Sequence, residues 1–269
     1  MTQPALFRLE ALFEEYEHVS DMLVLGSSDA RTRTIGELLE MSQESLLPET
    51  RLSYTEPRGE PALRDSIAAR HQRPREDVLI TTGANEAIFL LLHSILSAGD
   101  RALVCSPGYQ SISEMARHAG ATLDTYDYPE GEDFRPNANA IAARIASAAQ
   151  PFTCVFLNSP HNPTGRVLTN SALDLILQVA AASGTRVIVD EVMSGIFASE
   201  AMRASSVSIR SHSAIAIGSV SKSFGLGGLR VGWIVAPPDV IDRCHPLAVL
   251  HDNLATNHRA ATRPHRRGA

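Results

Sequence analysis

The segment 219–233 places the strongest constraint on what this chain can fold into. It lies between two apolar runs, 214–217 and 231–236, whose length and composition predict buried strands. Between the strands the chain carries glycines, three serine hydroxyls, Lys222 and Arg230. Glycines let a backbone approach a ligand closely, and hydroxyl and guanidinium groups donate hydrogen bonds to phosphate. The pattern predicts a loop that holds one lysine beside an anion site, where its amine can form a Schiff base with a carbonyl compound.

Three other interpretations of this loop compete with that one. The glycines at 225–228 are compatible with a dinucleotide-binding fingerprint, but the fingerprint needs Gly or Ala where Arg230 stands. A Walker loop places its lysine after the glycines, whereas Lys222 precedes them. An ordinary glycine-rich surface turn remains the third alternative, and the loop alone does not decide against it.

The loop resembles the lysine segment of class I/II aminotransferases, which are fold-type I pyridoxal-phosphate enzymes. Its Ser-x-Ser-Lys sequence, its glycine-rich turn and its Arg-x-Gly sequence match the pattern of that family. The resemblance implies pyridoxal 5'-phosphate as the cofactor, a Schiff base on Lys222, and phosphate contacts from Ser219 and Arg230 with Ser221 nearby. It also implies the family's three-layer α/β/α large domain, which contains a mostly parallel sheet.

A second candidate anion site follows the apolar run 78–82. That run predicts a strand, and residues 83–96 predict the helix that comes after it. Unpaired N–H groups and the helix dipole converge at such a helix start, although a plain strand-to-helix turn has the same pattern. By the resemblance, Gly83, Ala84 and Asn85 form the phosphate cup, mainly through main-chain amides.

Two further turns follow predicted strands. Tyr109 comes after the strand 102–105, and it either packs under the next helix or, as the resemblance implies, stacks on the cofactor ring. Asn162 lies in the Pro-rich and Asn-rich sequence 158–165, which by itself predicts only a turn. The resemblance implies that Asn162 hydrogen-bonds the ring oxygen of the cofactor. No role is predicted for His161.

Asp190 lies at the end of the predicted buried strand 186–191. Ligands of open parallel sheets bind at the carboxyl ends of the strands, and a carboxylate there can pair with a protonated pyridine nitrogen. The resemblance gives Asp190 this role; without the other motifs, an acid that caps a helix or turn would be the default. The family usually has a tyrosine three residues later, where this chain has Met193.

Met193, the sequence 25–29 and the sequence 229–233 together resemble the capreomycidine-synthase-like branch of the family. That resemblance implies elimination and cyclisation of a guanidino amino acid instead of transamination. Tyr54 matches the family tyrosine that reaches across a homodimer to the partner's cofactor phosphate. Read without the resemblance, Tyr54 is a loop tyrosine anchored by its ring.

Composition excludes several other classes of protein. A net charge of −6 argues against a nucleic-acid-binding surface, and no apolar run reaches the length of a transmembrane helix. The three cysteines have neither metal-binding nor redox spacing, which favours a reduced, cytoplasmic setting.

The chain divides into an N-terminal arm (1–45), a pyridoxal-phosphate-binding large domain (46–243) and an irregular basic tail (244–269). The arm is predicted to hold a helix over 5–18, a strand over 21–29 and a helix over 34–41. The resemblance covers roughly 20–243. The tail shows no helix or strand period, and the family's small domain, with the arginine that grips the substrate carboxylate, has no match. We therefore expect a truncated or frame-shifted reading frame with little turnover of its own.

These observations favour a pyridoxal-phosphate-dependent enzyme that acts on an amino acid. Lys222, Asp190 and Tyr109 are the predicted catalytic residues, and Lys222 would also carry the Cα proton. No metal is predicted. Two alternatives remain open: an inactive remnant that still binds the cofactor, and a cofactor-binding regulatory module. The regulatory module would need a DNA-binding domain, and no basic helix-turn-helix pattern precedes residue 50.

Overall fold

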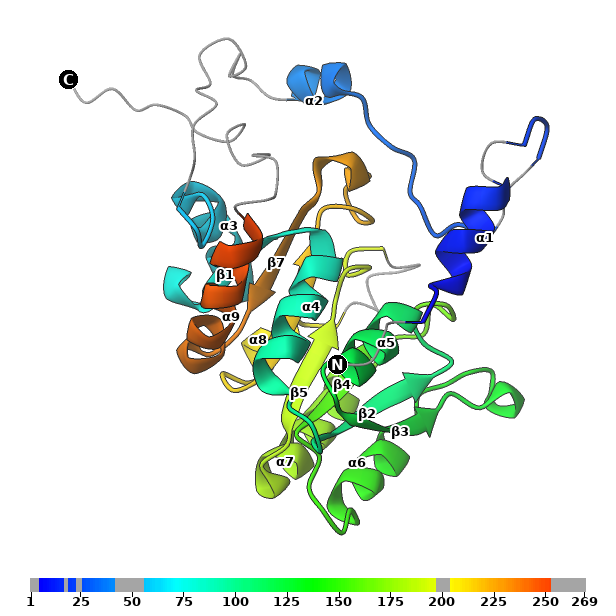
Figure 1. Ribbon diagram of the computed structural model, residues 1–269, viewed down its shortest axis with the longest axis vertical. Coiled ribbons are helices and arrows are strands. Elements are labelled where there is room, and N and C mark those ends of the chain that lie inside the picture. The colour runs from blue at the N-terminus through cyan, green and yellow to red at the C-terminus, as the bar shows by residue number, and fades with distance from the viewer. Residues whose placement is uncertain (1–4, 17–18, 23–25, 42–55, 197–203, 253–269) are drawn as a thin grey trace.

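The computed structural model describes residues 5–16, 19–22, 26–41, 56–196 and 204–252. The strands within these ranges are β1 (Val78–Thr82), β2 (Arg101–Ser106), β3 (Thr122–Asp127), β4 (Cys154–Asn158), β5 (Arg186–Asp190), β6 (Ile215–Ser219) and β7 (Val231–Val235). They form one sheet in the order β1-β7-β6-β5-β4-β2-β3 (Figure 1). Strand β7 is antiparallel to β1 and β6, and the other neighbouring pairs are parallel. The predicted mostly parallel sheet is confirmed.

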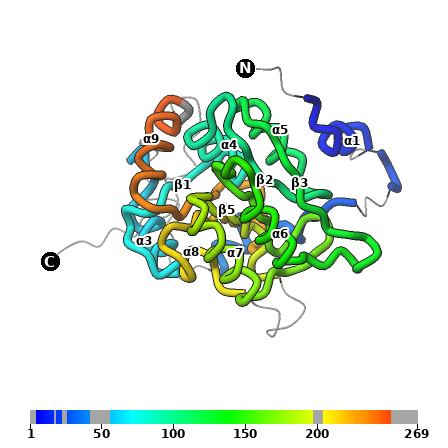
Figure 2. Tube along the Cα trace, turned by 90° about the horizontal axis from the view of Figure 1, so that it is seen from below, coloured from blue at the N-terminus to red at the C-terminus, as the bar shows by residue number. Residues whose placement is uncertain are grey.

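Helices cover both faces of this sheet. The helices that cover it are α3 (Pro61–His71), α4 (Gly83–Ile95), α5 (Gln110–His118), α6 (Ala138–Ala146), α7 (Asn170–Ser183), α8 (Val207–Arg210) and α9 (Pro238–Asp252), whereas α1 (Arg8–Tyr16) and α2 (Ile35–Met41) of the N-terminal arm bury no residue. One apolar core joins the sheet to α4, α5 and α9, and a second joins it to α3, α6, α7 and α8. Figure 2 shows the two groups of helices on opposite sides of the strands. The predicted three-layer architecture is confirmed.

Strand β4 shows how one apolar run supplies both cores. Successive side chains of a strand point to opposite faces of the sheet. Accordingly, Cys154 and Phe156 belong to the core under α4, α5 and α9, whereas Val155 and Leu157 belong to the opposite core. All four are at most 1% exposed. A strand that is buried on both faces needs apolar residues at every position, which explains the continuous run in the sequence.

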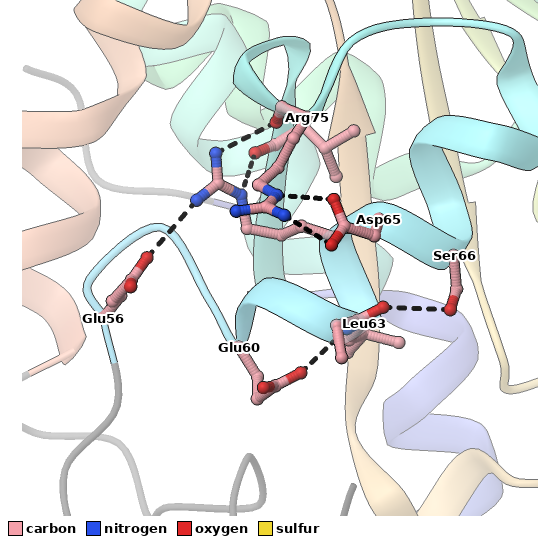
Figure 3. Close-up of polar contacts among 9 residues, drawn as sticks. Glu56, Glu60, Leu63, Asp65, Ser66 and Arg75 are labelled. Carbon is pink, nitrogen blue, oxygen red and sulfur yellow. Dashed lines mark hydrogen bonds and ion pairs between the residues drawn. The ribbon is translucent and has the colours of Figure 1, made fainter. Parts of the chain in front are cut away.

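Helix α3 is attached firmly to the strand that leads towards the site (Figure 3). Glu60 caps its first turn by accepting a backbone N–H at 2.8 Å. Asp65 accepts two hydrogen bonds from Arg75, each of 2.5 Å. The buried Arg64 donates to the Val78 carbonyl at the start of β1 at 3.1 Å. These contacts hold the beginning of β1 in place.

Of two sequence-based expectations about the ends of the chain, one lies mainly outside the described residues and one is wrong. The apolar part of the short strand predicted within 21–29 falls on residues 23–25, which are not described, and the polar residues 26–29, predicted as its closing turn, lie at the surface. The expectation of no helix beyond residue 244 fails for residues 244–252, which belong to α9. The apolar face of α9, including Ile241, Cys244 and Ala248, packs on α4, and this packing outweighs the proline inside the helix. Among the described residues, no helix is both long and apolar enough to cross a membrane.

Candidate active site

The predicted site residues meet in one cavity of about 580 Å³. It opens where β4, β5 and β6 end and α4 begins, which is the usual place for a ligand in an open α/β sheet. Its lining includes Ala84, Asn85, Tyr109, Asn162, Asp190, Met193, Ser219, Ser221, Lys222 and Arg230. Gly83 lies against the Arg230 guanidinium. Tyr54 falls outside the described residues.

Lys222 is the only lysine in the sequence, and its amine faces the cavity. Nζ donates a hydrogen bond to Asp29, which also lines the cavity. The Ser27 hydroxyl donates to the same carboxyl group at 2.9 Å. The hydrogen bond from Lys222, with smaller help from Ser27, holds the pKa of Asp29 below its usual value. In the sequence Asp29 marks only one branch of the family, and no local pattern predicts its contact with the lysine.

The segment that carries Asp29 is anchored on the lysine loop. The Arg33 backbone N–H donates to the Gly225 carbonyl at 3.1 Å, and its guanidinium donates to the Phe224 carbonyl at 3.3 Å. Gly225 has φ +67°, and a Cβ there would lie 2.4 Å from the Arg31 carbonyl oxygen. Only glycine therefore allows this close approach. The N-terminal arm forms one wall of the cavity because of these contacts.

The anion end of the cavity is formed by Gly83, Arg230 and the start of α4. Gly83 has φ +79°, and a Cβ on it would lie 2.4 Å from an Arg230 nitrogen. Arg230 itself has φ +51°, and its guanidinium donates to the Gly227 carbonyl at 3.1 Å. The first amides of a helix have no partner within the helix, so the Ala84 and Asn85 N–H groups are placed to bind an anion beside this guanidinium.

Ser219 and Ser221 are neighbours in this structure. The Ser219 hydroxyl lies 3.0 Å from the Val231 carbonyl, which can only accept, so the hydroxyl proton points there. Its oxygen in turn accepts from the Ser221 backbone N–H at 3.0 Å and lies 2.8 Å from the Ser221 hydroxyl. A phosphate contact from Ser219 stays a prediction, and it requires this hydroxyl to turn away from Val231.

Asp190 presents a buried carboxyl group at the end of β5. It is 7% exposed, and one oxygen accepts the Val192 backbone N–H at 2.9 Å. Burial raises its pKa to about 6, and the hydrogen bond from Val192 offsets part of this rise. A cationic N–H donor in the cavity would favour the ionised form of this acid. A protonated pyridine nitrogen is such a donor.

Tyr109 and Asn162 line the same cavity as Asp190 and Arg230. The ring of Tyr109 makes an edge contact with Phe7 of the arm, with ring centroids 5.4 Å apart. Burial raises the pKa of Tyr109, and a hydrogen bond with Asn85 opposes this. The Asn162 backbone N–H donates to the Asn158 side chain at 2.6 Å. Met193 supplies a thioether to the lining where a family tyrosine would supply a hydroxyl.

An amine, a buried carboxyl group, an aromatic ring and an anion-binding helix start therefore surround one space. This set of groups fits pyridoxal phosphate, whose aldehyde, ring nitrogen, ring face and phosphate need one partner each.

Comparison with known proteins identifies the class. The model of the family "Aminotransferase class I and II" matches residues 20–249, so this chain belongs to that family, whose members use pyridoxal phosphate. The match extends beyond residue 243, where we expected the resemblance to end. Arginine–pyruvate transaminase AruH of Pseudomonas aeruginosa is 29% identical over 240 residues, and aspartate aminotransferase of Pyrococcus horikoshii is 27% identical. Both alignments cover 87% of this chain, which spans about 60% of the length of these relatives.

Solved structures agree with the fold. A PLP-dependent aminotransferase from Streptococcus suis superposes with a TM-score of 0.83 at 24% identity. The superposition covers 96% of this chain and 68% of the Streptococcus suis chain. The PLP-dependent cyclase OrfR superposes with a TM-score of 0.82 at 26% identity, covering 95% and 66%.

Gly232 offers a test of how the anion end is packed. A Cβ at Gly232 would lie 2.5 Å from the Gly83 carbonyl carbon and 2.8 Å from the Ala84 nitrogen, so Gly232→Ala must push β7 away from the start of α4. We expect a loss of about 1–3 kcal/mol in the free energy of unfolding, measured with urea. Gly228→Ala is the matched control, because its Cβ would meet no atom within 4 Å. Equal stability of the two variants would contradict this packing.

The two buried acids at the end of β5 predict a pH dependence. Burial raises the pKa of Asp190 to about 6 and that of Glu191 to about 7. Between about pH 4 and about pH 7 the folded chain holds protons that the unfolded chain has lost, so stability falls as the pH rises through this window. We expect urea unfolding of the cofactor-free protein to show this fall, and the double variant Asp190→Asn/Glu191→Gln to flatten it. An unchanged slope in the double variant would mean that other groups cause it.

Proposed function

We propose that this chain binds pyridoxal 5'-phosphate and performs chemistry at the Cα of an amino acid, with Lys222, Asp190 and Tyr109 as its catalytic residues. The observation that carries the proposal is that the only lysine lines the same cavity as the buried Asp190 carboxyl group and the Asn162 amide. When bound, pyridoxal phosphate supplies an aldehyde carbon that condenses with amines and a ring that accepts electrons from Cα.

Each residue then has a definite task. Lys222 would hold the cofactor through Nζ and would move the Cα proton as a general base. Asp29 accepts a hydrogen bond from Nζ and so orients the amine. Asp190 holds a proton at the ring nitrogen, and Asn162 donates to the ring oxygen. Tyr109 covers the ring face, which limits the access of water.

The anion end anchors the cofactor by its phosphate. Arg230 contributes a fixed positive charge, and the amides at Gly83, Ala84 and Asn85 donate hydrogen bonds. The hydroxyls of Ser219 and Ser221 lie beside them. A cofactor anchored at this end would share the cavity with Lys222, and holding reacting groups together in one site lowers the entropic cost of the reaction.

Covalent trapping tests this proposal directly. The protein is loaded with pyridoxal phosphate, reduced with borohydride, digested and analysed by mass spectrometry. We expect one reduced adduct, on the peptide that contains Lys222. Lys222 is the only lysine in the sequence, so the α-amino group is the only other amine that could form a Schiff base. An unmodified Lys222 at saturating cofactor would overturn the proposal. Adduct formation without Cα–H exchange on any amino acid would favour the inactive remnant or the regulatory module.

Transamination is the reaction that the family membership favours. Elimination and cyclisation of a guanidino amino acid is the second candidate, and the acidic lining at Glu10 and Asp29 favours it, because carboxylates suit a cationic side chain. The likeness to an arginine–pyruvate transaminase agrees with a basic substrate, and the likeness to a PLP-dependent cyclase agrees with cyclisation. The test compares Cα–H exchange on L-arginine with that on the uncharged analogue L-citrulline. We expect arginine to exchange faster, and equal rates would remove the second candidate.

We also propose that the active form is a homodimer in which Tyr54 reaches the neighbouring site. Membership of a family that forms dimers supports this. Complementation tests it, because a mixed dimer of Lys222→Arg and Tyr54→Ala subunits contains one site with both residues intact. We expect mixing and refolding to restore Cα–H exchange that neither variant shows alone. No recovery in a mixture with proven subunit exchange would place Tyr54 in the site of its own subunit or outside any site.

A further inference from the structure

His161 lies at the centre of a contact that joins two loops of the site. It is fully buried at 0% exposure. Its Nε2 lies 3.0 Å from the Pro107 carbonyl oxygen, and its Nδ1 lies 2.8 Å from the Thr164 hydroxyl. Because a carbonyl oxygen can only accept, Nε2 carries the ring proton and Nδ1 accepts from Thr164. Burial lowers the pKa of His161, which agrees with this neutral form.

The two loops that His161 joins carry different faces of the cavity. Pro107 lies two residues before Tyr109, and Thr164 closes the turn that contains Asn162. Within that turn, the Gly165 backbone N–H donates to the His161 carbonyl at 2.7 Å. Pro107 and His161 are 54 positions apart in the sequence. The histidine therefore connects the loop that carries Tyr109 with the turn that carries Asn162.

Tyr128 fixes the plane of the His161 ring. The two rings are stacked with centroids 4.0 Å apart and an interplanar angle of 4°. Tyr128 is itself tied to the first loop, because its backbone N–H donates to the Ser106 carbonyl at 2.9 Å. Its buried hydroxyl has no hydrogen-bond partner in the described part of the chain. The ring of Tyr128, and not its hydroxyl, therefore supports the histidine.

We propose that His161 is a positioning residue that holds the Tyr109 loop and the Asn162 turn at one spacing before any ligand binds. Both of its ring nitrogens are used and its plane is held, so the ring has no freedom that would let one loop move without the other. A preorganised gap of this kind saves the ordering cost on binding. The consequence for cofactor affinity rests on the proposed function, whereas the connection between the loops does not.

Hydrogen–deuterium exchange on the cofactor-free protein tests the connection. His161→Phe keeps a ring against Tyr128 but removes both hydrogen bonds, and we expect exchange to rise at least about tenfold in residues 106–109 and in residues 158–165. Tyr128→Phe is the matched control, and we expect changes of no more than about twofold, because it removes a hydroxyl without a partner. Residues 215–219 of β6 should remain protected in both variants.

The outcomes of this experiment are distinct. Faster exchange in the 158–165 turn alone would overturn the connection between the loops, and faster exchange everywhere would show a general loss of stability instead of positioning. If His161→Phe does not fold, Thr164→Val decides the question. It removes the bond at Nδ1 and the 3.3 Å bond from the Arg166 backbone N–H but leaves the Nε2 bond to Pro107, and we expect a smaller rise in both loops. No rise in either loop would refute the proposal.

A second measurement asks whether the spacing matters for binding. We expect His161→Phe to weaken the affinity for pyridoxal phosphate about tenfold and to reduce the circular dichroism of the bound chromophore, with Tyr128→Phe close to wild type. Wild-type affinity and dichroism in His161→Phe would show that the spacing does not serve the cofactor. Failure of the wild-type protein to form the Lys222 adduct would reject the proposed function. The hydrogen–deuterium exchange of the cofactor-free protein would test the connection between the loops independently of that result.

Discussion

Lys222→Arg is expected to abolish the borohydride-stable adduct and to slow Cα–H exchange about 10⁴-fold, the upper range for the loss of a general base. The reason is chemical. A guanidinium stays protonated in proteins, so it can neither attack an aldehyde nor accept the Cα proton. It still offers a positive charge to Asp29, whose carboxyl group accepts a hydrogen bond from the lysine. The variant therefore removes the chemistry and retains the local charge.

The control for this variant is its stability. The Lys222 side chain is 23% exposed and makes its ion pair at the cavity wall, where such pairs contribute little, about 0–1 kcal/mol. We expect urea unfolding of the cofactor-free variant to match that of the wild type within this amount. If the folded variant exchanged the Cα proton at the wild-type rate, another group would have to move the proton.

Asp190→Asn should produce the second-largest effect. At saturating pyridoxal phosphate we expect Cα–H exchange to fall on the order of 100-fold or more, because an amide cannot balance the positive charge of a protonated ring nitrogen. Binding should suffer less, since the phosphate end of the site is unchanged. The measurement is the exchange rate of the Cα proton, followed by NMR, together with a titration of cofactor affinity.

Glu191→Gln is the matched control for Asp190→Asn. Glu191 is the next residue along the chain and is also buried, but it lines a different cavity and accepts the Val207 backbone N–H at 2.7 Å. If a buried carboxyl group at the end of β5 were all that the reaction needed, both variants would lose the same fraction of the Cα–H exchange rate. We expect Glu191→Gln to keep most of the exchange rate. Equal losses in the two variants would remove the special role of Asp190.

Most of the sheet was predictable because its strands are continuous apolar runs between turn sequences. Strands β4 and β6 are buried along their whole length, so the local sequence carries the signal clearly. The N-terminal arm gave a weaker signal. The strand predicted within 21–29 has its apolar part at 23–25, outside the described residues, and the contact of Asp29 in the following turn with Lys222 was not predicted. Such a contact between distant segments is a tertiary property, and composition alone does not reveal it.

The anion end of the site was predictable in kind and not in detail. Gly83 and Arg230 were identified from turn chemistry and spacing, and the structure places the guanidinium directly on the glycine. The direction of the Ser219 hydroxyl was not predictable, because it depends on the Val231 carbonyl of the adjacent strand. Hydroxyl groups take the partner that the fold brings near, and a motif does not specify that partner.

The class of the protein, its single lysine and the turns that carry Tyr109, Asn162 and Asp190 could all be predicted from the amino-acid sequence. These features are local, since each depends on a short run of residues and its spacing. Which groups contact one another became visible only in the folded chain. Asp29 meets Lys222 across 193 positions, and His161 meets Pro107 across 54. The pKa of Asp190 likewise rises because residues from several elements exclude water from it. Contacts and burial of this kind arise from the packing of distant segments, so no local pattern could have predicted them.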